Sequence, residues 1–238
     1  MIEATITSSK ITEEKYFFDP FVIKVEMDSS GDVWKPTPHG YALANGMVRV
    51  PHAFSGKSMI EIGAGSGIHA MLALKLGAKS IDITDINQIS LTIAQNNADK
   101  NKVQYRHKWI KDWMNFDPPE KYDFVLCNPP FCKSGTPDRR WFITALIEES
   151  KRFLKPGGHI MFSQSSMANF PKTEQELTEN DYTHEVVYSS RGLFRDYYFT
   201  EPGFIEESRR VENGFDIIEG EYIETLQVYL ATKKMDAQ

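Results

Sequence analysis

The chain has 238 residues, of which 41% are apolar and 25% are charged, a balance typical of a globular protein with a sizeable core. It contains no run of 18 apolar residues and no basic-then-apolar leader, so we expect a cytoplasmic protein without membrane contact. The net charge of −6 argues against strong non-specific nucleic-acid binding, and two cysteines, Cys127 and Cys132, provide neither a disulfide framework nor a zinc pattern.

The first fifty residues show a different pattern of predicted elements from the rest of the chain. The stretch FVIKVEM (21–27) has the composition of a strand, and the turn signal DSSGD leads on to VWKP, which together predict an N-terminal β-hairpin. A proline-containing loop follows, and then a helix that is expected to end near Val50. We therefore treat residues 1–50 as an extension and residues 51–238 as the main domain.

Strands and helices alternate from Ser58 onward. Strands are predicted for SMIEIG, SIDITD, YDFVLC and HIMFSQ, and helices for GIHAMLALKLGA, QISLTIAQNNADKN and RRWFITALIEESKRFLKPGG. Gly77 closes the first helix as a C-terminal cap, and Pro156 with two glycines stops the last. The alternation predicts an α/β fold with a mostly parallel sheet and helices on both faces, in which ligands bind at the carboxyl ends of the strands.

The first predicted strand ends in a glycine-rich turn, EIGAGSG. Glu61 precedes it, and Gly63, Gly65 and Gly67 allow tight curvature and the close approach of a ligand to the backbone. A plain strand-to-helix turn is the alternative. The dinucleotide pattern G-x-G-x-x-G fails because Ile68 occupies its last position, which counts against NAD.

Acidic residues end the next two strands. Asp85 lies 18 residues beyond Gly67, where its carboxylate can accept hydrogen bonds from both hydroxyls of a ribose. Its alternative role is the N-cap of the following helix. Asp112 and Trp113 come at the end of a further strand, where the acid can accept a hydrogen bond from an adenine amino group and the aromatic ring can cover the base; an ordinary surface loop is the alternative.

The strand YDFVLC ends in Asn128, Pro129, Pro130 and Phe131. The nitrogen of an amide or exocyclic amine is a poor nucleophile until its hydrogens are held, and the Asn128 side chain and the Pro129 carbonyl can accept both N–H bonds. The prolines stiffen the turn, and Phe131 can stack on a planar acceptor. A rigid turn without chemistry is the alternative; the other proline pair, 118–119, precedes its strand.

These ordered motifs between Pro36 and Gln164 resemble class I S-adenosylmethionine-dependent methyltransferases, in particular the Asn-Pro-Pro-aromatic N-methyltransferases of release-factor glutamine and of RNA bases. The resemblance implies a Rossmann-like, seven-stranded sheet with an antiparallel last strand, here TLQVYLATKK. It implies that Asn128 to Phe131 are catalytic. The implied cofactor-binding residues are Glu61, Gly63, Gly65, Gly67, Asp85, Asp112, Trp113 and Asn128, with Thr37 as a candidate in the loop over the cofactor.

Two features bear on the methyl acceptor. The first 50 residues are expected to form a hairpin and a loop rather than the N-terminal helical domain of release-factor methyltransferases, which argues against a release-factor substrate. The chain also carries an acidic insertion, 196–224, that is either a lid or a solvated excursion. Basic residues gather in two places; the first group comprises Lys100, Lys102, Arg106, Lys108 and Lys111, and the second comprises Lys133, Arg139 and Arg140. The second group follows the Asn-Pro-Pro-Phe motif and is a candidate for contact with a phosphate-bearing substrate, with a solvated face as the alternative.

We therefore expect an S-adenosylmethionine-dependent N-methyltransferase that acts without a metal, since the six histidines show no ligand spacing. Its acceptor is expected to be an RNA base amine or a protein side-chain amide, with a small molecule as the alternative. A non-catalytic cofactor-binding or scaffold module is the alternative from another class, and intact Asn128 and Pro129 argue against it.

Overall fold

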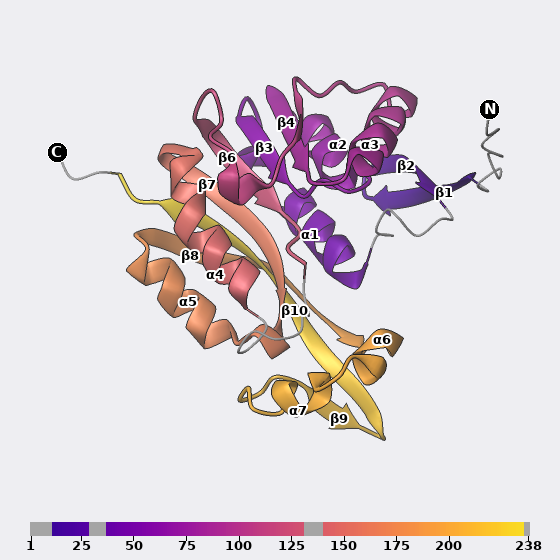
Figure 1. Cartoon of the computed structure of the whole chain (residues 1–238), viewed down its shortest axis with the longest axis vertical. Coiled ribbons are helices and arrows are strands. Elements are labelled where there is room, and N and C mark those ends of the chain that lie inside the picture. Colours follow the sequence, from indigo (N-terminus) through magenta and orange to yellow (C-terminus); the bar gives the residue numbers. More distant parts are fainter. Residues whose placement is uncertain (1–10, 29–36, 131–139, 236–238) are drawn as a thin grey trace, which may run out of the picture.

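A twisted β-sheet forms the centre of the molecule in the computed structural model, which describes residues 11–28, 37–130 and 140–235 (Figure 1). Its strands are β3 (Ser58–Ile62), β4 (Ser80–Asp85), β5 (Lys108–Ile110), β6 (Tyr122–Cys127), β7 (Leu154–Ser165), β8 (Tyr182–Leu193), β9 (Asp216–Ile218) and β10 (Glu221–Lys233). Seven lie in the order β5-β4-β3-β6-β7-β10-β8, with β10 antiparallel to both neighbours. The predicted seven-stranded sheet is confirmed, and β9 adds a short eighth strand beside β10.

The helices cover opposite faces of this sheet. Helices α1 (Pro38–Arg49), α2 (Ile68–Lys75) and α3 (Gln88–Lys100) pack on one face, and α4 (Trp141–Glu149) and α5 (Phe170–Glu179) pack on the other. Successive residues of a strand point to opposite faces. Accordingly, Val228 of β10 belongs to the core under α1 to α3, and its neighbour Tyr229 belongs to the core under α4 and α5.

The N-terminal hairpin is present, but its strands differ from the predicted pair. Strand β2 (Phe21–Asp28) pairs with β1 (Ile11–Phe18), which precedes it, whereas the predicted partner VWKP lies outside the described residues. The overlooked signal was the Asp19-Pro20 turn after a stretch in which Tyr16 and Phe18 alternate with polar or exposed residues. The hairpin is fastened to α3, where Asn97 Oδ1 accepts the Glu26 N–H at 2.6 Å.

Helix α4 ends at Glu149, earlier than the prediction that Pro156 stops it. A short turn (Ser150–Arg152) follows, and β7 then begins at Leu154. Phe153 and Leu154 are both buried, so the chain leaves the helix to place these side chains in the core before the proline is reached. The Pro-Gly-Gly segment therefore belongs to the start of the strand.

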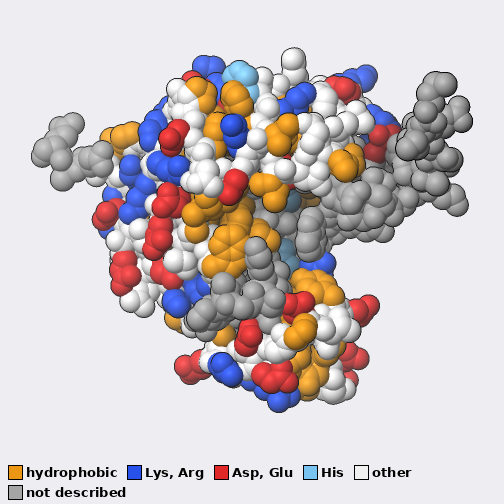
Figure 2. Space-filling model, in the orientation of Figure 1, with side chains coloured by type: hydrophobic (Ala, Val, Ile, Leu, Met, Phe, Trp, Pro, Cys, Tyr) orange, Lys and Arg blue, Asp and Glu red, His pale blue; other side chains and the backbone are white. Residues whose placement is uncertain are grey.

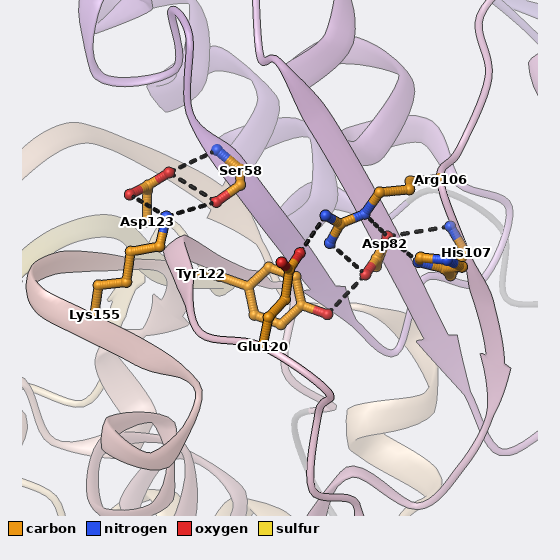
Figure 3. A network of polar contacts seen from close by, with 8 residues as sticks. All are labelled: Ser58, Asp82, Arg106, His107, Glu120, Tyr122, Asp123 and Lys155. Carbon is orange, nitrogen blue, oxygen red and sulfur yellow. Dashed lines mark hydrogen bonds and ion pairs between the residues drawn. The ribbon is translucent and has the colours of Figure 1, made fainter.

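Two polar networks brace the amino ends of the strands (Figure 3). Asp82 of β4 has no exposed surface and accepts hydrogen bonds from the Arg106 guanidinium, at 2.8 and 2.9 Å, and from the Tyr122 hydroxyl at 2.7 Å. In the second network, burial works to raise the pKa of Asp123, but hydrogen bonds from Ser58 and Lys155 outweigh it and lower that pKa to about 2. Charged groups thus tie β4 to β6, and β3 to β6 and β7, at the edge away from the predicted site.

The acidic insertion 196–224, which we call the lobe, is a folded unit. It contains α6 (Asp196–Thr200), α7 (Phe204–Ser208), β9 and the first four residues of β10. Tyr198 and Phe204 stack with ring centroids 4.5 Å apart and are fully buried with Phe194 and Met167 around them. An aromatic core of its own fixes the lobe against the end of the sheet, below the main body in Figure 1.

Gly46 sets the distance between α1 and the sheet. A Cβ atom at this position would lie 2.7 Å from Val228 Cγ1 and 3.3 Å from Met161 Cε. We expect Gly46→Ala to lower the free energy of unfolding by about 1–2 kcal/mol, because overpacking outweighs the helix propensity gain of about 1 kcal/mol. Urea denaturation measures this change. In a Val228→Ala background the same substitution should cost less, and an equal cost in both backgrounds would contradict the contact as its cause.

Candidate active site

The glycine turn after β3 presents open backbone on one side. Gly63 and Gly65 have φ of +68° and +53°, and a Cβ on either would meet no atom within 4 Å, so a ligand has room to approach the chain there. Gly67 is different: its Cβ would lie 2.3 Å from the Tyr105 hydroxyl oxygen and 3.0 Å from Ala94. The structure thus gives Gly67, predicted as a cofactor contact, a packing role between α2 and α3.

Glu61 supports the glycine turn from the interior of the protein. Its buried carboxyl accepts the Ala70 N–H, in the first turn of α2, at 3.0 Å, and lies 3.3 Å from His69 Nδ1. His69 Nε2 lies 2.9 Å from the Gly40 carbonyl, which only accepts, so Nε2 carries a proton. One further proton must then lie between the Glu61 carboxyl and His69 Nδ1. Burial raises the pKa of Glu61, which favours the proton on the carboxyl.

Asp85, at the end of β4, faces the glycine turn. Its Oδ2 accepts the Gly65 N–H at 2.9 Å, and its Oδ1 accepts the Asn87 N–H at 2.9 Å. The alternative role as N-cap is wrong, because Asn87 caps α3 by accepting the Ile89 N–H. Sequence reasoning missed Ile86, which is 76% exposed directly after Asp85. An apolar residue immediately beyond the strand-end acid was the available signal.

Asp112 and Trp113, the two cofactor contacts predicted after β5, lie in different surroundings. Asp112 is exposed and caps the short turn Trp113–Asn115 by accepting the Met114 N–H at 3.1 Å. It stays close to Asp85, whose carbonyl accepts the N–H of Lys111. Trp113 instead is buried with its ring centroid 5.4 Å from that of Phe142. The prediction that Trp113 covers a bound base therefore does not fit, because its ring packs in the core under α4.

Asn128 follows β6 at the same edge of the sheet. Ser163 of β7 donates a hydrogen bond to its Oδ1 at 2.8 Å, and Pro129 is buried while Pro130 is exposed. A Cβ on Gly40 would lie 3.5 Å from both Asn128 Nδ2 and His69, so the first turn of α1 lies over the amide. Cys127, just before it, is 1% exposed, and burial raises the pKa of its thiol well above the usual range. Phe131 lies outside the described residues.

Thr37 directly precedes α1. It is the N-cap residue, and its hydroxyl accepts the Gly40 N–H at 3.3 Å. Since Gly40 also borders Asn128, this cap helps to set the position of the helix end over the site. Thr37 therefore has a structural role here, and contact with a cofactor stays a prediction.

Of the basic residues considered for phosphate contact, Arg140 is not placed for that role. Arg140 is 2% exposed and donates to Glu176 at 2.6 Å and to the carbonyls of Ala168 and Asn169, so it joins α4 to α5 and cannot face a phosphate in solvent. Lys133 and Arg139 lie outside the described residues. In the other group, Arg106 pairs with Asp82 and Glu120, and Lys100 pairs with Glu26.

A second buried pair lies where α1 meets the lobe. His39 Nε2 is 3.8 Å from Glu224 Oε2, and the Tyr198 hydroxyl donates to Glu224 Oε1 at 3.3 Å. Burial raises the pKa of Glu224 to about 7, although Ser165, Tyr198 and the charge of Arg195 act in the opposite direction. Burial and the charge of Arg195 lower the pKa of His39 to about 3. Sequence reasoning missed this pair, since only the fold brings positions 39 and 224 together.

Within the described ranges, no group of three or more His, Cys, Asp or Glu side chains is arranged to hold a metal ion. Among the same residues, no helix has the length and apolar composition needed to cross a membrane. The site at the carboxyl edge of the sheet is thus an open glycine turn flanked by Asp85, with Asn128 beyond it under the start of α1.

Comparisons with known proteins agree with this architecture. The family model described as methyltransferase small domain matches residues 46–192. A ribosomal protein L11 methyltransferase of Lactobacillus delbrueckii is 33% identical over 125 residues, which is 52% of this chain and 37% of that protein. A candidate protein N5-glutamine methyltransferase of Methanocaldococcus jannaschii is 27% identical over 170 residues, 65% of this chain and 83% of that one.

Solved structures share the fold. A 16S rRNA methyltransferase of T. thermophilus, in complex with AdoMet and guanosine, superposes with a TM-score of 0.63 at 16% identity and covers 97% of this chain and 52% of that one. A ribosomal protein L11 methylase of Lactobacillus delbrueckii gives a TM-score of 0.56 at 22% identity, over 85% and 83% of the two chains. Because the family model matches more than half of its residues, this chain belongs to the methyltransferase small domain family. It spans little more than a third of the L11 methyltransferase with which it aligns.

The buried Glu224 carboxyl makes a pH-dependent contribution to stability. Its pKa is raised in the folded protein, so the unfolded chain releases this proton first and stability falls as pH rises from about 4.5 to about 7. Glu224→Gln removes that loss. We compare the free energy of unfolding of Glu224→Gln with that of wild type by urea denaturation. We expect the variant-minus-wild-type difference to be about 2 kcal/mol larger at pH 8 than at pH 5. The same difference at both pH values would contradict this raised pKa.

Proposed function

We propose that the protein is an S-adenosylmethionine-dependent N-methyltransferase that acts on a planar nitrogen of RNA or protein. The observation that carries the proposal is the position of Asn128, at the end of β6 and beneath the start of α1, at the same edge as the open glycine turn. Family membership supports methyl transfer. The named relatives methylate a ribosomal protein or 16S rRNA, which supports a macromolecular acceptor.

The residues of the glycine turn fit the proposed cofactor. S-adenosylmethionine supplies a methyl group that its sulfonium already activates. Gly63 and Gly65 leave open space for a ligand against the backbone, and the Asp85 carboxylate beside them suits the two hydroxyls of a ribose. The exposed side chain of Ile86 offers an apolar surface for the flat face of a base. Glu61 supports the turn from the interior and is assigned to holding its shape.

Asn128 is assigned to the acceptor nitrogen. Its Oδ1 and the Pro129 carbonyl each accept one N–H, which aligns the nitrogen lone pair and stabilises the positive charge that develops as the nitrogen is methylated. The Ser163 hydroxyl donates to Oδ1 at 2.8 Å, which leaves a second lone pair of that oxygen for an N–H of the acceptor. Positioning and electrostatics are thus the contribution of the protein.

Removal of the Asp85 carboxylate tests the cofactor site. We expect Asp85→Ala to weaken S-adenosylmethionine binding by about 1.5–3 kcal/mol, through loss of charge-assisted hydrogen bonds, as measured by isothermal titration calorimetry. Asp117→Ala serves as the control, because the Asp117 side chain is 94% exposed. Binding of NAD in place of S-adenosylmethionine would overturn the proposed function.

Removal of the Asn128 amide tests the chemistry. Asn128→Ala is expected to lower methyl transfer about 100-fold while cofactor affinity changes little, because the lost interaction acts on the transition state. Ser163→Ala, which removes only the group that orients the amide, should cause a smaller loss. The readout is transfer of labelled methyl groups to fractionated RNA and protein pools, and unchanged transfer by Asn128→Ala would refute the assigned role.

A further inference from the structure

The negative charge of the chain is concentrated in the lobe. Residues 196–224 contain nine acids, two arginines and no lysine, a net charge of −7, whereas the whole chain carries −6. The remaining residues together carry +1. Asp196, Glu206, Glu212, Glu219 and Glu221 are exposed, and acidic side chains are visible over the lower part of the molecule in Figure 2. A phosphate backbone is repelled by this surface, and a cationic partner is attracted.

The same lobe exposes large apolar side chains. Phe199 and Ile217 are each 54% exposed, and both adjoin Tyr222: the Phe199 and Tyr222 ring centroids are 5.3 Å apart, and Ile217 pairs with Tyr222 between β9 and β10. We call these three residues the patch. Apolar side chains clustered at a charged surface are typical of an interaction site.

The patch lies on the face of the sheet that carries Asn128. Tyr222 and Val228 are six residues apart in β10, so they point to the same face, and Val228 pairs with Ser163, which bonds Asn128. At about 3.3 Å per residue, the patch is roughly 20 Å from the level of Asn128 along the strand. An extended polypeptide covers that distance with about six residues.

We propose that the methyl acceptor is presented by a basic polypeptide segment that docks on the lobe, with an apolar side chain on the patch about six residues from the methylated side chain. This rests on the proposed function and narrows its acceptor to protein. Lysine or arginine side chains of the segment face the exposed acids of the lobe. RNA is the competing acceptor.

Synthetic peptides and RNA provide the direct comparison. The probes are fluorescent 15-residue peptides of Lys, Gly and Ser with a central Gln and a Leu or Phe six residues away on either side, together with a 15-nucleotide single-stranded RNA. Binding is measured by fluorescence anisotropy with saturating S-adenosylhomocysteine at several salt concentrations. We expect the peptides to bind at least tenfold more tightly than the RNA, and replacement of the apolar anchor by Ser to weaken binding about tenfold.

Variants of the protein identify the surface. Phe199→Ser with Ile217→Ser should weaken peptide binding about tenfold, and Glu206→Lys with Glu212→Lys should weaken it similarly and flatten its salt dependence. The matched control is Glu148→Lys with Glu185→Lys, which makes the same change in net charge at exposed positions outside the lobe and should alter affinity less than twofold. Calorimetric binding of S-adenosylmethionine and the thermal unfolding midpoint verify that each variant is folded.

Different results would contradict the docking proposal and the proposed function. Tighter binding of RNA than of every peptide, absence of peptide binding, or equal effects of the lobe and control variants would overturn the docking proposal while leaving the proposed function intact. Absence of S-adenosylmethionine binding by the wild-type protein would overturn the proposed function itself.

Discussion

The buried carboxyl of Glu61 is the constraint on which the site depends. It joins three elements, since it belongs to β3, accepts a backbone N–H of α2 and contacts His69, which in turn holds the Gly40 carbonyl of α1. The glycine turn, the start of α1 and the position of Asn128 beneath Gly40 are therefore coupled. A buried acid is costly unless its partners are in place, so this group favours one arrangement of all three.

The two edges of the sheet are built differently. At the amino ends, Asp82 and Asp123 are saturated by arginine, tyrosine, serine and lysine partners that lock neighbouring strands together. At the carboxyl ends, the polar groups face loops and helix starts, and the two donors to the Asp85 carboxylate in the described part of the chain are backbone N–H groups. Rigidity at one edge leaves the other free to carry a site, which is where α/β sheets bind ligands.

The fold was largely predictable because strand and helix periods alternate cleanly from Ser58 onward, and because strand-end residues of a parallel sheet share one edge. Side-chain direction was not predictable. Trp113 and Gly67 stand in motif positions but face the core, and Arg140 looks like a surface cation yet is buried between α4 and α5. The His39–Glu224 pair depends on tertiary packing between residues far apart in sequence, which no local pattern contains.

The thiol of Cys127 can report on opening of the strand next to the site. It lies at the end of β6, directly before Asn128, with 1% of its surface exposed and a pKa far above the usual range. Alkylating reagents attack thiolates that they can reach, so the rate at which Cys127 is modified follows the opening of this strand. Protection of Cys127 by a bound ligand, read separately from modification of Cys132, would measure how strongly that ligand stabilises the centre of the sheet.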